Sequence, residues 1–158
     1  MLPQDIMIER LRQICQQDER LIAAMLYGSF TRQEADKFSD IDIVLFFADE
    51  SLAEINQPAW VSQIAPVELY YHNEFGNGVA IFTNLIRAEF HFDSASDMHK
   101  IESWQGNAWF PSLGDVVLVD RTGQLARHLQ VLVGPPAPHT ILRHTLRDRF
   151  LSMVRETS

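Results

Sequence analysis

The first segment of the chain distributes apolar and polar residues with the period of a helix. Over residues 3–17 the apolar positions recur every three or four residues, and Pro3 stands where a first helical turn tolerates proline. The apolar positions of this segment are Ile6, Ile8, Leu11, Ile14 and Cys15. The pattern predicts an amphipathic helix, in which the lone cysteine is a packed core thiol.

Continuous apolar runs follow and predict buried strands. Residues 21–27 form a run that stops at Gly28-Ser29, which is typical of a buried strand that enters a tight turn. Residues 31–37 are polar and predict a short helix or a loop. Residues 40–47 begin with two acids and continue as an apolar run, so we expect a second buried strand with its acids at the start.

The middle of the chain mixes helical and strand patterns. The expected elements are a helix over 51–64 interrupted at Pro58, strands over 67–72, 85–92 and 115–120, a turn over 73–78, and a helix over 124–133. In the strand over 85–92, period-2 geometry places an apolar set on one face and a polar set on the other. The apolar set is Ile86, Ala88, Phe90 and Phe92, and the polar set is Arg87, Glu89 and His91. One face is therefore expected to be core and the other to carry chemistry.

The C-terminal segment is separated from the rest by the Pro-rich residues 134–138. Beyond them, Leu142, Leu146, Phe150 and Val154 form an i, i+4 stripe on a basic helix. We therefore expect one domain over residues 1–134 and an amphipathic helix over 139–158. This helix either packs on its own sheet or meets a second copy, and a two-fold homodimer is the prediction.

Composition and charge narrow the classes of protein. The 158 residues, 46% hydrophobic and 22% charged, suit one globular domain with a real core. The net charge of −8 repels phosphate backbones, so no nucleic-acid partner is expected. A single cysteine excludes an internal disulfide. No apolar run is long enough to span a bilayer, so no membrane partner is expected and the cytoplasm is the expected compartment.

The strongest chemical pattern is Gly28-Ser29 followed, after a polar connection, by Asp40-Ile41-Asp42 and an apolar strand. Gly28 permits close approach of a ligand to the backbone, and Ser29 can donate to phosphate oxygens. Asp40 and Asp42 point to the same face of a strand, where paired carboxylates can bind a hard cation such as Mg²⁺. The alternative is a solvated strand start whose acids cap a neighbouring helix.

Four further residues are candidates for the same site. Glu89, on the polar face of its strand, could accept a proton from a hydroxyl or complete a metal site, or it could pair with a neighbour on the surface. Arg87 and Lys37 could neutralise phosphate charge, although a loop lysine is more often solvated. His91 could orient Glu89 or contact substrate, or it could make an ordinary polar contact.

These motifs resemble the nucleotidyltransferase superfamily that includes DNA polymerase beta, and more closely its two-domain lincosamide nucleotidyltransferases. The resemblance is carried by Met25 to Thr31, Phe38 to Asp42, Arg87 to Phe92, Trp104 to Gly106 and Trp109 to Ser112. It implies a nucleotidyltransferase fold of the α/β (α+β) type, with a mixed twisted sheet and flanking helices. It also implies Asp40, Asp42 and Glu89 as the metal-binding carboxylates and Gly28-Ser29 as the phosphate turn.

The same resemblance implies an enzyme that uses Mg²⁺ and a nucleoside triphosphate. The triphosphate is expected to be ATP, from which the enzyme moves AMP to a hydroxyl of a small molecule. A lincosamide-type antibiotic is the expected acceptor, which would make the activity one of antibiotic resistance. By the same resemblance, most of the helical domain of those enzymes is expected to be missing here, and residues 139–158 are expected to be its remnant. Two alternatives stay open: adenylylation of a partner-protein hydroxyl, and an interaction module that retains the fold.

Three aromatic residues near the end of the resemblance, Trp104, Trp109 and Phe110, are expected to be core rather than a stacking surface.

Overall fold

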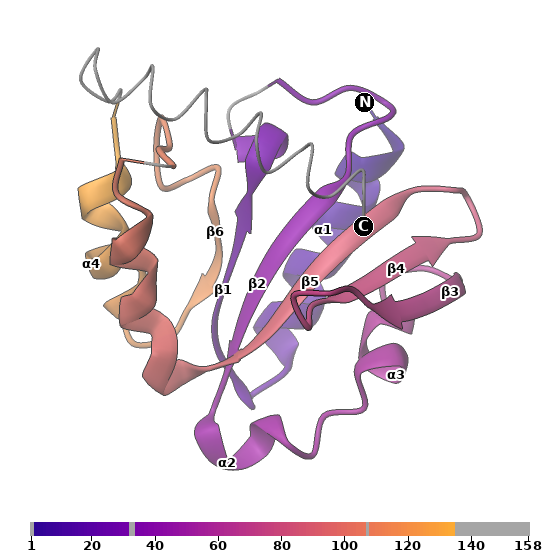
Figure 1. Ribbon diagram of the computed structural model, residues 1–158, viewed down its shortest axis with the longest axis horizontal. Helices are drawn as coiled ribbons and strands as arrows, with labels where there is room; N and C mark the ends of the chain where they lie inside the picture. Colours follow the sequence, from indigo (N-terminus) through magenta and orange to yellow (C-terminus); the bar gives the residue numbers. More distant parts are fainter. Residues whose placement is uncertain (1, 32–33, 107, 135–158) are drawn as a thin grey trace.

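The computed structural model describes residues 2–31, 34–106 and 108–134. The expected α/β class is confirmed, because a mixed six-stranded sheet carries helices on both faces (Figure 1). The elements, with η for 3₁₀ helices, are α1 (Pro3–Gln17), β1 (Leu21–Tyr27), η1 (Gly28–Thr31), β2 (Ile41–Phe47), α2 (Asp49–Leu52), α3 (Gln57–Ser62), β3 (Val67–His72), β4 (Gly78–Phe82), β5 (Arg87–Ser94), η2 (Ala95–Trp104), β6 (Val117–Asp120), α4 (Gln124–Leu129) and η3 (Gln130–Leu132).

The strand order in the sheet is β3-β4-β5-β2-β1-β6. Strands β2 and β5 run parallel, and the other neighbouring strands of this sheet run antiparallel. The parallel pair is central and joins two strands that lie far apart in the sequence. It brings the segment that begins with the two acids directly beside the segment that contains Glu89.

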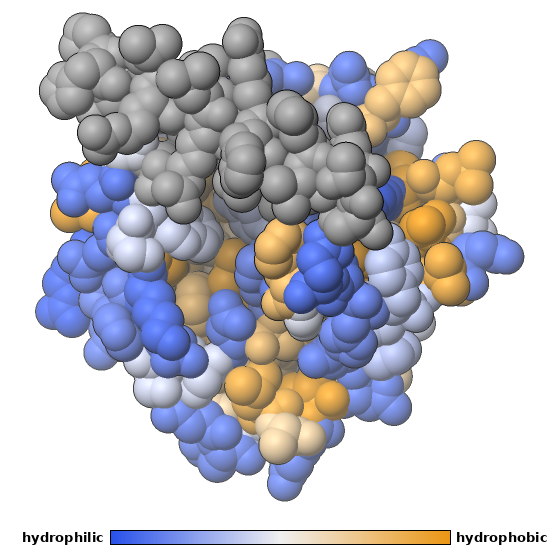
Figure 2. Space-filling view, viewed as in Figure 1, coloured by the Kyte–Doolittle hydropathy of each residue, from blue (hydrophilic) through white to orange (hydrophobic). Residues whose placement is uncertain are grey.

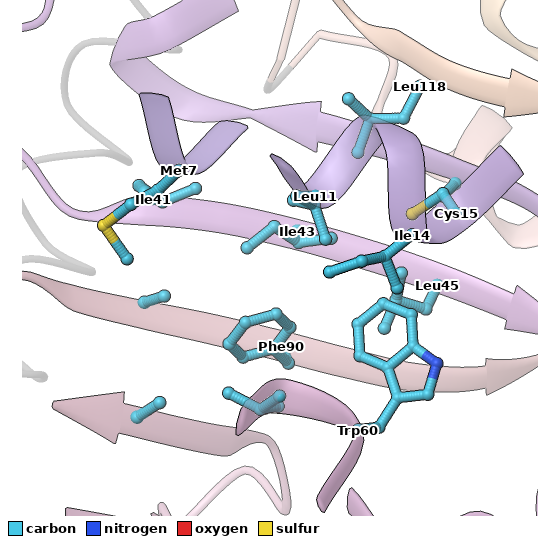
Figure 3. Packing of buried hydrophobic residues seen from close by; sticks show 14 of the residues in the cluster. Met7, Leu11, Ile14, Cys15, Ile41, Ile43, Leu45, Trp60, Phe90 and Leu118 are labelled. Carbon is cyan, nitrogen blue, oxygen red and sulfur yellow. The ribbon is translucent and has the colours of Figure 1, made fainter. Parts of the chain in front are cut away.

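The two faces of the sheet bury separate apolar clusters. Helices α1 and α3 cover the first face, where Leu11 of α1 packs with Ile43 of β2 and Phe90 of β5 (Figure 3). Helices η2 and α4 cover part of the second face, where Met25 and Phe46 are buried. Burial of apolar surface contributes about 25 cal/mol of stabilisation per Å². The two clusters therefore stabilise the sheet from both faces.

The helix predicted over residues 3–17 is confirmed, with the same bounds as α1. The Leu2 N–H donates to the Asp5 carboxylate at 2.8 Å, which satisfies one amide before the helix begins. Cys15 is buried, as expected, and burial raises the pKa of its thiol to about 12. The thiol therefore stays protonated at neutral pH and is a packing group.

Several boundaries differ from the prediction. Pro58 lies in the first turn of α3 rather than interrupting a helix, and Asn56 caps that turn by accepting from the Ala59 N–H at 3.1 Å. Strand β4 was not predicted, because a five-residue apolar run has no period that separates it from a loop. Leu85 lies in the turn before β5 with φ +72°, so β5 begins two residues later than predicted. The helix predicted over 124–133 tightens after Leu129 into η3.

The predicted amphipathic helix over 139–158, and with it the basis for the predicted homodimer, lies outside the described residues. Within the described part of the chain, none of the helices has the length and apolar character needed to cross a membrane.

Candidate functional site

The second face of the sheet changes from apolar to polar along its strands. At one end it is covered by η2 and α4, whereas at the other end it presents Tyr27 of β1, Asp42 of β2 and Glu89 of β5. Asp42 is the register partner of both Tyr27 and Glu89. Residues paired across neighbouring strands share a face, with backbones about 4.8 Å apart. The two acidic side chains are therefore direct neighbours at the end of the central strands.

Gly28 follows β1 and lies against Asp42. Its φ is +81°, and a Cβ placed there would lie 2.7 Å from the Asp42 Oδ2 atom. Thr31, which is fully buried, closes the η1 turn by donating its hydroxyl to the Gly28 carbonyl at 2.6 Å. The glycine thus supplies a backbone conformation that other residues rarely adopt, and it lets the Asp42 carboxylate lie close to the backbone.

Replacing Gly28 by Ala is expected to destabilise the fold by about 1–3 kcal/mol and to displace Asp42. Gly123 is a matched control, because its φ is +74° but no atom lies within 4 Å of its missing Cβ. Urea unfolding should show a loss in both Gly28→Ala and Gly123→Ala, whereas only Gly28→Ala should change the NMR chemical shifts of Asp42. Unchanged chemical shifts of Asp42 in Gly28→Ala would contradict the close contact between Gly28 and Asp42.

Asp40 lies just before β2 and forms an ion pair with Arg87, the first residue of β5. The Arg87 Nη1 atom lies 2.6 Å from the Asp40 Oδ2 atom, and both side chains are partly exposed. Burial would lower the pKa of Arg87, but the charge of Asp40, with bonds to Asp40 and Tyr71, outweighs it and raises the pKa. The structure thus brings the predicted acid Asp40 to Arg87.

Glu89 is buried, with 1% of its surface exposed. Its Oε1 atom accepts hydrogen bonds from the side-chain amides of Asn73 and Asn77, each at 3.1 Å. Both asparagines lie in the turn between β3 and β4, which the sequence analysis treated only as a turn. The signal that could have found them is the pair of asparagines on either side of Gly76.

Gln4 is a second residue that the sequence analysis missed. It is fully buried, and its side-chain amide donates to the carbonyls of Asp36, Lys37 and Ser39 at 3.2, 3.0 and 3.1 Å. These carbonyls belong to the loop that ends at Asp40, so α1 fixes the chain just before the acids. The signal was a polar side chain in line with Met7 and Leu11 on the buried side of α1.

The remaining predicted residues are His91, Lys37 and Ser29, and each has its own surroundings. His91 shares a hydrogen bond with the Tyr27 hydroxyl at 2.8 Å, and Asp93 continues the same polar row of β5. Burial raises the pKa of Asp93. Lys37 is exposed, with its ammonium 5.1 Å from the centre of the Phe38 ring. Ser29 lies in the η1 turn directly after Gly28.

The predicted aromatic residues divide between core and half-buried positions. Phe110 is buried in the second cluster, as expected. Trp104 is half-buried and lies beside Tyr27, with ring centres 5.9 Å apart, and Trp109 is also half-buried. Trp104 therefore borders the polar end of the sheet face.

The donor chemistry of this face suits a hard divalent cation. Asp42 and Glu89 supply neighbouring carboxylates, and carboxylate oxygens are the donors that such a cation prefers. Among the residues that the structure describes, no three His, Cys, Asp or Glu side chains lie close enough together to hold a metal ion. Asp40, which Arg87 holds through its Oδ2 atom, therefore does not complete such a set in this arrangement.

Comparison with known proteins adds a family match. Residues 9–75 match the family described as "Polymerase beta, Nucleotidyltransferase". The matched segment covers less than half of the chain and includes Gly28, Asp40 and Asp42 but not Glu89. The mixed six-stranded sheet with flanking helices is consistent with the nucleotidyltransferase fold. No curated protein matches the chain.

Among solved structures, the chain is similar to an aminoglycoside 6-adenyltransferase from Bacillus subtilis. The sequence identity is 18% and the TM-score is 0.45, and the match covers 63% of this chain. The chain spans little more than a third of that protein, because the match covers 38% of its length.

Proposed function

We propose that the polar end of the second sheet face is a nucleotidyl-transfer centre. The observation that carries the proposal is the register pairing of Asp42 with Glu89, next to the close contact of Gly28 with the Asp42 carboxylate. The family match over residues 9–75 supports the same chemistry, since it includes the Gly-Ser turn and both strand acids. The substrates proposed are a nucleoside triphosphate, with ATP as the expected donor, and a molecule with a free hydroxyl.

The proposed reaction divides the work among residues of three segments. Mg²⁺, when bound, would neutralise the phosphates of the triphosphate. Asp42 and Glu89 would hold the cation. Asp40 would become a third ligand when the cation replaces Arg87 as its partner. The backbone at Gly28-Ser29 would donate to phosphate oxygens, and Arg87, once released, could oppose the charge that develops there. Glu89 would accept the proton of the hydroxyl that attacks the α-phosphorus as pyrophosphate leaves.

An apolar rim beside the carboxylates supports a partly apolar acceptor. Hydrophobic residues gather over the β3–β4 edge at the right of Figure 2, and the exposed hydrophobic side chains of this edge include Leu69 and Tyr71. The register of the sheet places Leu69 in one row with Arg87, and Tyr71 in one row with Glu89. With the motif resemblance described above, this rim supports a lincosamide-type hydroxyl as the acceptor. Adenylylation of a partner-protein hydroxyl is the second candidate.

The proposal is tested with the full chain, Mg²⁺, each nucleoside triphosphate in turn, and a panel of lincosamides and aminoglycosides. Mass spectrometry of the acceptors should show the gain of one nucleoside monophosphate by at least one lincosamide. A gain on the protein itself, or on a co-purified protein, would favour the second candidate. No gain on any acceptor with any nucleotide would overturn the proposal.

The Arg87–Asp40 ion pair leads to a prediction on metal affinity. Because the guanidinium competes with a cation for Asp40, Arg87→Gln should bind free Mn²⁺ several-fold more tightly than the wild type. The same variant should bind nucleoside triphosphate more weakly, since it lacks a cation near the phosphates. Calorimetric titrations with Mn²⁺ alone and with nucleotide check both directions. Weaker Mn²⁺ binding would contradict the competition.

A further inference from the structure

The turn between β3 and β4 makes two hydrogen bonds to one atom of Glu89. The Nδ2 atoms of Asn73 and Asn77 each lie 3.1 Å from Oε1. A carboxylate oxygen has two lone pairs in its plane, so two donors satisfy this oxygen. The terminal torsion of a glutamate is otherwise broad, and the two donors fix the plane of the carboxylate.

The turn is itself held by Asn73. The Asn73 Oδ1 atom accepts from the Phe75 and Asn77 N–H groups at 3.1 and 3.0 Å, and the Asn73 N–H donates to the Asn77 carbonyl at 3.0 Å. Gly76, with φ +79°, permits the reversal of the chain. One end of the Asn73 amide thus closes the turn while the other end contacts Glu89.

The sheet anchors this turn next to the acid. Strand β4 begins at Gly78 directly after the turn, and Val79 is the register partner of Glu89. Glu89 is 1% exposed, so water does not compete for its Oε1 atom. The donors and the acceptor are therefore carried by neighbouring strands of one sheet.

We propose that Asn73 and Asn77 are positioning residues that orient the Glu89 carboxylate and direct its Oε2 atom to the reactants. The effect on catalysis rests on the proposed function, because it requires Glu89 to take part in nucleotidyl transfer. The structural contact does not rest on it and has a separate test. Neither asparagine contacts substrate in this proposal, and both act through Glu89.

Asn77→Ala is the sharpest variant for catalysis. The bonds that Asn77 makes within the turn come from its backbone, so the substitution removes the donor to Glu89 and keeps the turn. The kcat should fall about tenfold, while KM for the triphosphate stays within about twofold. The kcat of Asn77→Asp should be lower still, because this variant places a second carboxylate against Glu89. Asn84→Ala is the control, since Asn84 serves the turn at the other end of β4 and should leave kcat unchanged.

Hydrogen exchange tests the contact without any activity. Glu89→Gln keeps a carbonyl oxygen for the two amides, whereas Glu89→Ala removes the acceptor. The amides of Gly76 and Asn77 should exchange faster in Glu89→Ala than in Glu89→Gln. Equal exchange in the two variants, or wild-type kcat in both Asn77 variants, would overturn the proposal. If the wild type transfers no nucleotide, the proposed function is wrong. The hydrogen-exchange result then shows on its own whether the two asparagines hold Glu89.

Discussion

Replacing Asp42 by Asn is expected to lower nucleotidyl transfer about a thousandfold, since it removes a ligand whose cation contributes several kcal/mol of charge stabilisation. The fold should remain intact. Asp42 is the register partner of buried Glu89, and the neutral amide relieves the repulsion between two carboxylates. Steady-state kinetics with the acceptor found by mass spectrometry, together with urea unfolding, measure both effects.

Asp93→Asn is the matched control for this variant. Asp93 lies on the same polar row of β5 as Glu89, and it is paired in register with Phe46 at the apolar end of the face. The same change of acid to amide should leave transfer within about threefold of the wild type, because Asp93 is assigned no contact with the cation. A comparable loss in both variants would mean that the face needs negative charge in general rather than Asp42 at its own position.

Glu89→Gln is expected to lower kcat by about 10²- to 10⁴-fold, the range for loss of a general base. The two asparagine donors can still contact the glutamine carbonyl, so the turn between β3 and β4 should keep its position. KM for the nucleoside triphosphate should change little, since proton removal matters in the transition state. If KM instead rises as much as kcat falls, Glu89 acts chiefly by holding the cation.

The main elements of the fold could be predicted because each has a periodic or continuous apolar pattern. The strands that carry Asp42 and Glu89 are confirmed, and the sheet pairs them directly with each other. Strand β4 could not be predicted, because its short run acquires its identity only by pairing between β3 and β5. The 3₁₀ helix η2 was missed in the same way, since its side chains Met98 and Ile101 are fixed by packing against the sheet.

The site could be predicted as a set of residue types but not as a set of contacts. The acids follow from their spacing, whereas the pairing of Asp40 with Arg87 depends on the parallel register of β2 and β5. Gln4 contacts Asp36, which lies 32 residues further along the chain, and Asn73 contacts Glu89, which lies 16 residues further along. Sequence patterns record local periodicity, so bonds of this range become visible only in the folded chain.

We propose that the Asp42–Glu89 face transfers a nucleoside monophosphate from a triphosphate to a hydroxyl. The most direct measurement is the amount of pyrophosphate released against the amount of modified acceptor formed, for the wild type and for Asp42→Asn under the same conditions. We expect equal amounts of the two products in the wild type and about a thousandfold less of both products in Asp42→Asn. Product formation by Asp42→Asn at the wild-type rate, or pyrophosphate release without modified acceptor in the wild type, would contradict it.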